Sequence, residues 1–343
     1  MTRPDTLPVA GLDLDRLEPW FRRHVLGVAG GLTATLLTGG MSNLTFLVTD
    51  GSRSWVVRRP PLGHVLATAH DMSREFRVMT ALRDTGVPVP AAHALCDDLD
   101  VLGAPFYVME YVAGRPFRHA HELAGLGTNR TRAVSTALVD TLAALHRIDP
   151  ADVGLADFGR PAGFPARQVR RWRKQLDASR SRELPDADRL HAALVERTPA
   201  DARHAIVHGD YRLDNVLVDD VDRVAAVVDW EMSTLGDPLT DVALLVLYTR
   251  LPELLPGHPA VADAPGAPGF LTADALAGRY AESSGHDLGD FGFYLGLAAF
   301  KLAVINEGIH YRFLAKKTVG DGFDRAGEAV PPLLEFGIAA LER

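Results

Sequence analysis

The part of this sequence that most constrains its fold is a 26-residue stretch near the middle of the chain. Residues 206–231 read IVHGDYRLDNVLVDDVDRVAAVVDWE. Short apolar runs alternate here with polar groups. The first run ends at His208, Asp210 and Asn215 lie between the first and second runs, and Asp229 follows the third. Short β-rich runs joined by a polar connection are typical of a hairpin. The stretch therefore predicts strands that bring Asp210, Asn215 and Asp229 to one end of a small sheet.

These polar groups suit a hard cation. The carboxylates of Asp210 and Asp229 and the amide oxygen of Asn215 are the kind of oxygen ligands that magnesium takes. A further carboxylate can then orient a substrate hydroxyl. The alternative is structural, because Asp and Asn are also common in hairpin turns.

The spacing His208-x-Asp210-x-x-x-x-Asn215, followed by a strand-borne Asp, resembles the catalytic loop and metal-binding Asp of protein-kinase-like phosphotransferases. The second-position Gly, Asp-Trp-Glu in place of Asp-Phe-Gly, and a downstream GDPLTD run resemble the aminoglycoside phosphotransferase and choline kinase branch. The runs VRRPP, HGDYR and VDWE are most similar to the kinase-like domains associated with acyl-CoA dehydrogenases.

This resemblance implies an α+β, bilobal, protein-kinase-like fold. It also implies that Asp210 orients the acceptor hydroxyl, that Asn215 and Asp229 bind magnesium, and that Glu231 is a further magnesium ligand through water. We expect a small β-rich N-terminal nucleotide-covering lobe at residues 1–113 and a larger, mainly helical catalytic and acceptor-binding lobe at residues 114–343. Residues 106–114 form a β-rich run that ends in Gly-Arg-Pro. By resemblance this run is the last strand of the first lobe plus the hinge, where backbone groups from Glu110 to Val112 hold the adenine.

A glycine turn between two β-rich arms is the candidate cover for a triphosphate. Its residues are Gly39 and Gly40, followed by Ser42 and Asn43, whose backbone amides and small polar side chains can contact phosphates. The turn departs from the protein-kinase pattern G-x-G-x-x-G. Taken alone, a Gly-Gly turn is usually only a hairpin.

The next strand carries a basic residue and the following helix an acidic one. Alternation along residues 54–59 places Val56 and Arg58 on one face of the strand. In residues 71–84 the carboxylate of Glu75 shares the apolar helix face. The resemblance puts Arg58 where kinases have a phosphate-gripping Lys, and makes Glu75 its partner. The alternatives are a solvated edge-strand Arg and an exposed Glu near a helix N-terminus.

The second lobe is predicted to be helical, and one of its helices is unusually basic. An apolar stripe runs through residues 134–145, and another helix is expected at residues 168–176. Seven cations lie on or beside the latter helix: Arg167, Arg170, Arg171, Arg173, Lys174, Arg180 and Arg182. They are either a solvated face or a contact for an anionic ligand. A long helix is expected at residues 291–316. In related phosphotransferases the late helices help to form the acceptor pocket.

The composition limits which binding partners and which cellular compartment we expect. Acidic residues exceed basic ones by 44 to 36, so we expect no nucleic acid partner. The single Cys96 cannot form an internal disulfide, which favours a reducing compartment. Because we find no signal-peptide pattern and no membrane-spanning run, we expect a cytoplasmic protein without a membrane partner. The oligomeric state stays open.

Together these features predict an enzyme that transfers phosphate from ATP, with Mg²⁺, to a hydroxyl of a small molecule. The basic cluster favours an anionic acceptor, such as a hydroxylated acid or a hydroxyacyl-CoA. The alternatives are an aminoglycoside or another acceptor of different charge, a regulatory nucleotide-binding pseudokinase, and a metal-dependent phosphohydrolase. The sequence does not distinguish ATP from GTP.

Overall fold

The computed structural model describes residues 10–37, 43–62, 71–199, 204–259, 261–317 and 323–342. The chain forms two compact units: Met1–Ala113 with Ala225–Glu231, and Gly114–Val224 with Met232–Arg343. We had predicted an uninterrupted second lobe from residue 114 to the end, whereas Ala225–Glu231 packs within the first unit. The predicted loop residues Gly39, Gly40 and Ser42 lie outside the described residues.

The first unit is built on a five-stranded antiparallel sheet with the strand order β1-β2-β3-β5-β4. Its strands are β1 (Thr33–Leu36), β2 (Leu44–Thr49), β3 (Ser54–Arg59), β4 (Ala92–Cys96) and β5 (Phe106–Glu110). Its helices are α1 (Leu14–His24), α2 (Met72–Leu82) and the short α3 (Leu99–Leu102), and β8 (Val224–Val227) leads into its last segment. The predicted strand at 54–59 and the helix within 71–84 are both present.

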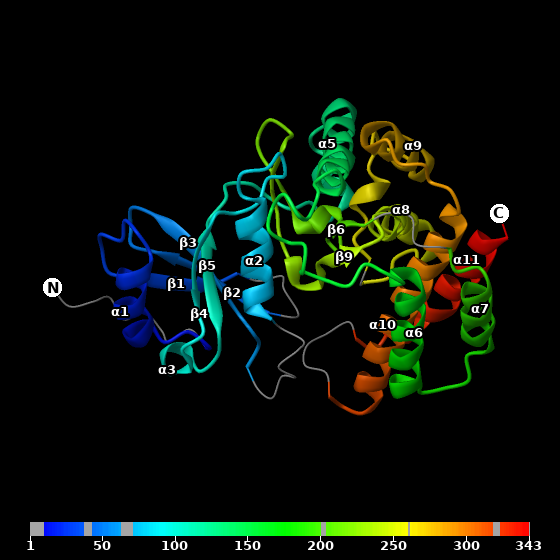
Figure 1. Ribbon diagram of the computed structural model, residues 1–343, viewed down its shortest axis with the longest axis horizontal. Helices are drawn as coiled ribbons and strands as arrows, with labels where there is room; N and C mark the ends of the chain where they lie inside the picture. Colours follow the sequence, from blue (N-terminus) through cyan, green and yellow to red (C-terminus); the bar gives the residue numbers. More distant parts are fainter. Residues whose placement is uncertain are drawn as a thin grey trace. The chain divides into compact units, whose positions relative to one another are not determined.

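The two faces of this sheet have different roles. Trp55 and Val57 of β3 belong to a buried apolar cluster with Leu17 and Phe21 of α1. Figure 1 shows α1 and α2 on opposite sides of the sheet. Since successive strand residues point to opposite faces, the alternation that buries Val57 under α1 turns Arg58 toward α2.

The second unit is mainly helical. Its helices are α4 (Ala120–Ala124), α5 (Thr128–His146), α6 (Phe164–Ser179), α7 (Pro185–Glu196), α8 (Leu239–Leu254), α9 (Ala273–Ser284), α10 (Phe291–Leu314) and α11 (Val330–Leu341). Its short strands are β6 (Ala205–Val207), β7 (Val216–Val218) and β9 (Thr234–Gly236), and β6 pairs antiparallel with β9. The predicted helices at 168–176 and 291–316 correspond to α6 and α10. Helices α7, α9 and α11 were not predicted.

Helix α10 organises the core of the second unit. It packs against α6, α8 and α11, which lie beside it in Figure 1. Contrary to our expectation, its length and apolar composition would allow it to cross a membrane, but 67% of its most apolar window is buried inside the fold. A helix that is apolar on nearly every side is expected at the centre of a large helical core.

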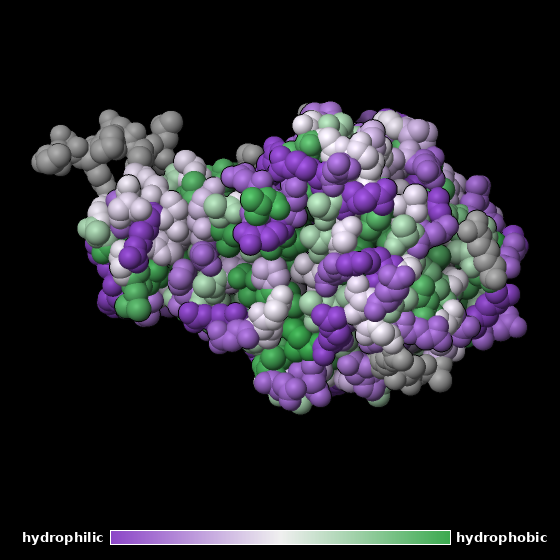
Figure 2. Space-filling view, turned by 90° about the horizontal axis from the view of Figure 1, so that it is seen from above, coloured by the Kyte–Doolittle hydropathy of each residue, from purple (hydrophilic) through white to green (hydrophobic). Residues whose placement is uncertain are grey.

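The surface carries no long run of exposed apolar side chains along any one described helix or strand. The exposed large apolar residues are spread over the described chain: among them are Leu26, Leu62, Leu99, Val195 and Val221. Figure 2 shows hydrophilic residues over much of the visible face, with smaller hydrophobic groups between them. Scattered apolar side chains of this kind are normal on a protein surface and indicate no binding site.

Candidate active site

The catalytic loop of the second unit begins where strand β6 ends. The backbone amides of His208 and Gly209 donate hydrogen bonds of 2.6 and 2.8 Å to the carboxylate of Asp241, which lies in the first turn of α8. His146, at the end of α5, contacts the same carboxylate at 3.3 Å. Burial raises the pKa of Asp241, but its contacts with His146 and with these amides outweigh burial and lower it. Asp241 thus fixes the start of the loop as a charged cap.

Gly209 is required at its position for two reasons. Its φ of +85° lies in the left-handed region, where side chains are rarely accommodated. A Cβ atom at this position would lie 2.6 Å from the carbonyl oxygen of Met232. The loop can therefore approach the Met232 backbone only with glycine here.

Asp210 follows and is held by neighbours on both carboxylate oxygens. Tyr248 of α8 donates its hydroxyl to Oδ1 at 2.6 Å. Asn215 donates its side-chain amide to Oδ2 at 3.3 Å and to the backbone carbonyl of Asp210 at 2.9 Å. Arg212 Nε lies 3.5 Å from Oδ2. These contacts leave the carboxylate with one orientation and about a quarter of its side chain exposed, at 26%.

The charge state of Asp210 follows from the same contacts. Burial raises the pKa of Asp210, but the cations Arg212 and Lys301 and the hydrogen bond from Tyr248 outweigh burial, so that the pKa falls below its ordinary value. The carboxylate is therefore ionised at neutral pH. It can accept a hydrogen bond from a hydroxyl group, but it is a weak base.

Asn215 fits a magnesium ligand by its orientation. Its nitrogen makes both hydrogen bonds to Asp210, which turns the amide oxygen away from that residue. An oxygen presented in this way is a suitable hard donor for Mg²⁺. Among the described residues no three His, Cys, Asp or Glu side chains gather as a metal-binding group. The donors suit an ion that arrives with phosphate oxygens of its own.

In the first unit the predicted pair of Arg58 and Glu75 is present. Arg58 Nε lies 3.1 Å from Glu75 Oε2, and Tyr107 of β5 donates its hydroxyl to the same oxygen at 2.9 Å. Burial raises the pKa of Glu75 to about 7, and the nearby Arg58 limits that rise. Both side chains are buried, which excludes the alternatives of a solvated Arg and an exposed Glu.

The other end of Arg58 reaches the acidic segment that joins this unit late in the chain. Its Nη2 forms an ion pair with Asp229 and lies 3.8 Å from Glu231. Asn43 donates its side-chain amide to Glu231 at 3.0 Å and to Glu75 at 3.4 Å. Five predicted site residues of the first unit, Asn43, Arg58, Glu75, Asp229 and Glu231, therefore form one connected network.

The backbone of Asp229 has an unusual conformation. Its φ of +69° is in the left-handed region, which Asp tolerates better than most side chains do. The next residue, Trp230, is buried and donates its indole N–H to the carbonyl of Val227 at 3.0 Å. The amide of Val227 in turn donates to Pro88 at 2.8 Å. Anchors on both sides of Asp229 hold this turn in place.

The predicted hinge lies at the end of β5. Glu110 is the last residue of the strand, and its amide donates to the carbonyl of Ala91 at 2.9 Å. That amide is therefore already engaged. Val112 lies beyond the strand end, which leaves the backbone after Glu110 as the candidate contact for a base.

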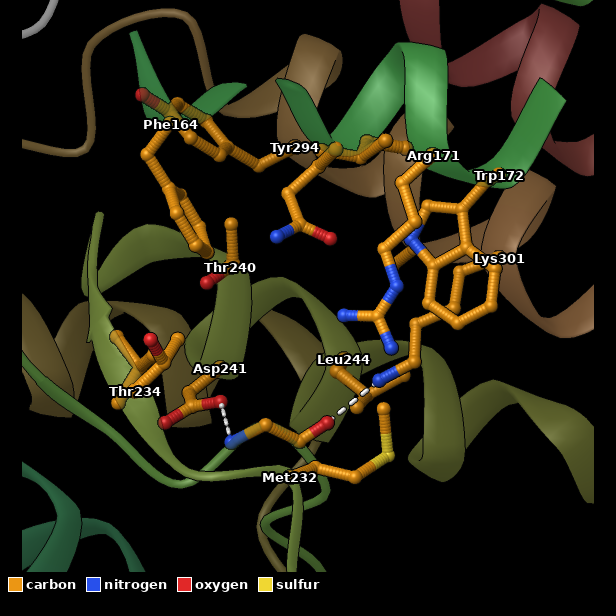
Figure 3. Close-up of a pocket in the computed structure, with 15 residues that line it drawn as sticks. Phe164, Arg171, Trp172, Met232, Thr234, Thr240, Asp241, Leu244, Tyr294 and Lys301 are labelled. Carbon is orange, nitrogen blue, oxygen red and sulfur yellow. Dashed lines mark hydrogen bonds between the residues drawn. The ribbon is translucent and has the colours of Figure 1, made fainter. Parts of the chain in front are cut away.

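A pocket in the second unit lies against the catalytic loop. It holds about 530 Å³ of empty space, part of it open to solvent. Gly209 forms part of its wall, and helices α6, α8 and α10 supply most of the rest. Figure 3 shows Arg171, Trp172 and Lys301 together at one end of the pocket and Phe164 at the other.

The basic helix α6 is not one continuous binding face. Four of its seven cations contact the protein itself. Arg173 and Arg180 both pair with Asp188. Arg182 lies 3.2 Å from the buried Glu307, and Arg167 donates to the carbonyls of Arg160 and Ala162. Arg170, Arg171 and Lys174 are exposed, as the solvated-face alternative requires, and of the seven cations only Arg171 also lines the pocket.

Three residues of this site were missed or left without a role: Tyr248, Arg212 and Lys301. Sequence spacing could not link Tyr248 to Asp210, because 38 residues separate them. For Lys301 a signal did exist, since it is the only Lys or Arg between Phe291 and Tyr311 in an otherwise apolar helix. Phe300, Val304 and Glu307 of the same helix are buried in the core.

Comparison with known proteins agrees with this geometry. The profile of the "Phosphotransferase enzyme family" matches residues 33–274, which include both groups of site residues. The chain belongs to this family. It is 35% identical over 347 aligned residues to acyl-CoA dehydrogenase family member 11 of Mus musculus, covering 99% of this chain and 44% of the mouse protein. The chain thus spans less than half the length of this curated relative.

Solved structures share the fold. A Ralstonia eutropha protein assigned as an aminoglycoside phosphotransferase is 34% identical, with a TM-score of 0.83 over 96% of this chain and 98% of that one. A structure of the aminoglycoside phosphotransferase APH(4)-Ia with ADP and hygromycin B has a TM-score of 0.58 at 15% identity, and covers 95% of this chain and 97% of that one. The chain has a protein-kinase-like fold, as the resemblance of its catalytic loop implies.

Proposed function

We propose that the protein transfers the γ-phosphoryl group of ATP to a hydroxyl of an anionic small molecule, such as a hydroxylated acid or a hydroxyacyl-CoA. The observation that carries the proposal is the Asp210 carboxylate, which Tyr248 and Asn215 hold in one orientation. It follows directly after Gly209, which lines a pocket with two cationic side chains.

In the proposed reaction, Asp210 accepts a hydrogen bond from the acceptor hydroxyl. The acceptor oxygen then bonds to the γ-phosphorus, the bond from that phosphorus to the bridging oxygen breaks, ADP leaves and the hydroxyl proton passes to Asp210. Because phosphoryl transfer has a loose transition state, orientation of the hydroxyl matters more than basicity. The lowered pKa of Asp210 is compatible with this role.

We assign nucleotide and metal contacts to the remaining residues. The ADP in the APH(4)-Ia complex supports nucleotide binding by this fold. Arg58, held by Glu75, is proposed to contact phosphates, and Asn43 to act beside it. Asn215 and Asp229 are proposed as ligands of Mg²⁺, with Glu231 supporting them. Mg²⁺ supplies positive charge to the phosphate oxygens when it is bound.

The anionic acceptor is supported by the charge of the pocket. Arg171 and Lys301 line it, whereas the one carboxylate in its lining, Asp241, is held by the loop amides and His146. A polycation such as hygromycin B or another aminoglycoside would be repelled by such a lining. The single, buried Cys96 supports a cytoplasmic location for this activity.

Measurement of ADP release tests the proposal. The purified protein is incubated with ATP, Mg²⁺ and pools of hydroxylated metabolites that include acids and acyl-CoAs, with kanamycin as the cationic comparison. We expect release with an anionic pool, and a loss of about 100-fold or more in Asp210→Asn at unchanged ATP affinity, as for removal of a general base.

The outcomes separate the alternatives. Efficient phosphorylation of kanamycin contradicts the anionic acceptor and keeps the phosphotransferase assignment. ATP binding without turnover in every pool favours the pseudokinase. Phosphate release from phosphorylated compounds in the absence of bound ATP favours the phosphohydrolase.

A further inference from the structure

The pocket beside the catalytic loop contains a cationic end. Lys301 extends from α10 and donates to the carbonyl oxygen of Gly209, and its ammonium group lies 5.7 Å from the ring centre of Trp172. The guanidinium of Arg171 lies 5.2 Å from the same indole ring. Two cations thus share one aromatic side chain at one end of the pocket, as Figure 3 shows.

These cations lack the acidic partners that the other α6 arginines have. Within the described part of the chain, neither Lys301 nor Arg171 forms a salt bridge, whereas Arg173 pairs with both Asp177 and Asp188. The polar contact of Lys301 is a neutral carbonyl. Cation–π contact with Trp172 offsets only a small part of the cost of holding two like charges together. An anion between them would remove that repulsion.

The rest of the pocket defines the shape of such an anion. Phe164, Leu244 and Leu297 add apolar surface to the lining, and Phe164 lies at the end opposite the cations (Figure 3). The hydroxyl of Tyr294 is engaged with Asp237 at 2.7 Å. A compact charged head at the cationic end and a short apolar stem toward Phe164 match this distribution.

We propose that this pocket is a subsite for a compact oxyanion of the acceptor, with Arg171 and Lys301 as its specificity-determining residues. The inference rests on the proposed function, because it takes the pocket beside Asp210 as the place where the acceptor binds. The oxyanion is a carboxylate or a terminal phosphate group. Gly209 lines the pocket and directly precedes Asp210 in the catalytic loop, so an anion held there would lie beside the loop that carries the catalytic carboxylate.

Binding of simple probes tests the subsite without turnover. Butyrate, its neutral isostere butyramide and inorganic phosphate are titrated into the whole protein by calorimetry or ligand-observed NMR. We expect butyrate or phosphate to bind at least tenfold more tightly than butyramide, and the tighter of the two identifies the head group. Arg171→Gln and Lys301→Met are each expected to weaken that binding at least tenfold. Arg170→Gln, the exposed neighbour on the same helix, is the matched control and should not.

Each outcome decides the inference. Equal affinity for butyrate and butyramide, no detectable binding of either anion, or equal affinity in parent and both variants overturns it. If Lys301→Met fails to fold, the exposed Arg171→Gln carries the test. Anion-selective binding without ADP release from any hydroxylated acid contradicts the proposed function and leaves the subsite. ADP release that is unchanged in Arg171→Gln contradicts the subsite and leaves the function.

Discussion

At the scale of single residues, the orientation of Asp210 depends on side chains far from it in sequence. Tyr248, which donates to its carboxylate, comes from α8, while Arg212 and Asn215 belong to the loop itself. Lys301 of α10 contributes its charge, which lowers the pKa of Asp210. The guanidinium of Arg212 lies 5.3 Å from the ring centre of Tyr248, so the two groups on Asp210 also support each other. Asp210 is therefore positioned by a cluster that no local motif defines.

Tyr248→Phe tests this positioning. The change removes the 2.6 Å hydrogen bond to Oδ1 and keeps the ring. A hydrogen bond to a charged group contributes about 1.5–3 kcal/mol, so we expect kcat to fall about tenfold to a hundredfold while KM for ATP stays constant. The hydrogen bond from Tyr248 lowers the pKa of Asp210, so its removal should raise that pKa. The acid limb of the kcat/KM profile should then move to higher pH.

The control for that experiment is Tyr311→Phe, an exposed tyrosine on α10. It should leave both kcat and the pH profile unchanged. A Tyr248→Phe variant with an unaltered acid limb would mean that the hydroxyl does not position Asp210.

Asp229→Ala tests the proposed metal ligand. Loss of the carboxylate should abolish turnover and remove most of the increase in ATP affinity that Mg²⁺ gives the parent. The variant also frees one end of Arg58, which now pairs with Asp229, so ATP affinity without Mg²⁺ should be kept or increased. Calorimetric titrations of ATP with Mg²⁺ and with EDTA measure both quantities. The same Mg²⁺ dependence in variant and parent would remove Asp229 from the metal site.

The sequence supports only part of this residue-level account. Asp210 and Asn215 could be singled out because their spacing is local and is fixed by one loop. Arg58 and Glu75 could be paired because the resemblance supplied the partner and alternation supplied the face. Tyr248 could not be found, since its contact depends on how α8 packs over the loop, and neither helical period nor composition encodes that packing.

At the scale of elements, the basic helix α6 shows how composition can mislead. Seven cations in a short segment suggested a ligand-binding face, but successive helix residues point about 100° apart. Arg173 and Arg180 consequently meet Asp188, Arg170 faces solvent and Arg171 enters the pocket. The charge that matters for the acceptor comes from one residue of α6 and one of α10, which only tertiary packing brings together.

The pH dependence of anion binding tests the cationic end of the pocket. Burial lowers the pKa of Lys301 from its ordinary value of 10.5, and Arg171 of α6 and Arg212 of the loop add to this effect. The carboxylates of Asp210 and Asp241 oppose it without cancelling it. Lys301 should therefore lose its charge at a lower pH than an exposed lysine does.

Butyrate affinity should accordingly be full below the lowered pKa of Lys301 and fall as pH rises through it. Titrations of butyrate across the alkaline range measure this decrease. Lys301→Met should bind weakly at every pH, without that step, and Arg170→Gln should reproduce the parent curve. A parent curve that is flat up to the ordinary lysine range would contradict the role of Lys301.

At the scale of the whole molecule, the first unit is built from two segments that are separated in the sequence. Ala225–Glu231 leaves the second unit, packs within the first and is followed by a return to the second at Met232. The sequence could predict a division near residue 113, because a β-rich run there gives way to helical periodicity. It could not predict that Ala225–Glu231 packs within the first unit, because the residue pattern of a short strand such as β8 does not indicate which unit the strand joins.

This interleaving makes a prediction about fragments. Trp230 is buried, with 1% of its surface exposed, and it is anchored through Val227 to Pro88 of the first unit. A fragment of residues 114–343 carries Trp230 but lacks Pro88 and the strands around it. We expect this fragment to unfold at a lower temperature than the whole protein and to show red-shifted tryptophan emission. Co-expression with residues 1–113 should restore both properties.

The matched variants in the whole protein are Trp230→Ala and Val221→Ala. Loss of a buried tryptophan typically costs about 3–5 kcal/mol, so Trp230→Ala should lower the free energy of unfolding by that order. Val221 is exposed and should contribute little. Denaturant titrations followed by circular dichroism measure both. A fragment of residues 114–343 as stable as the whole protein, together with a neutral Trp230→Ala, would show that stability does not depend on the packing of the late segment within the first unit.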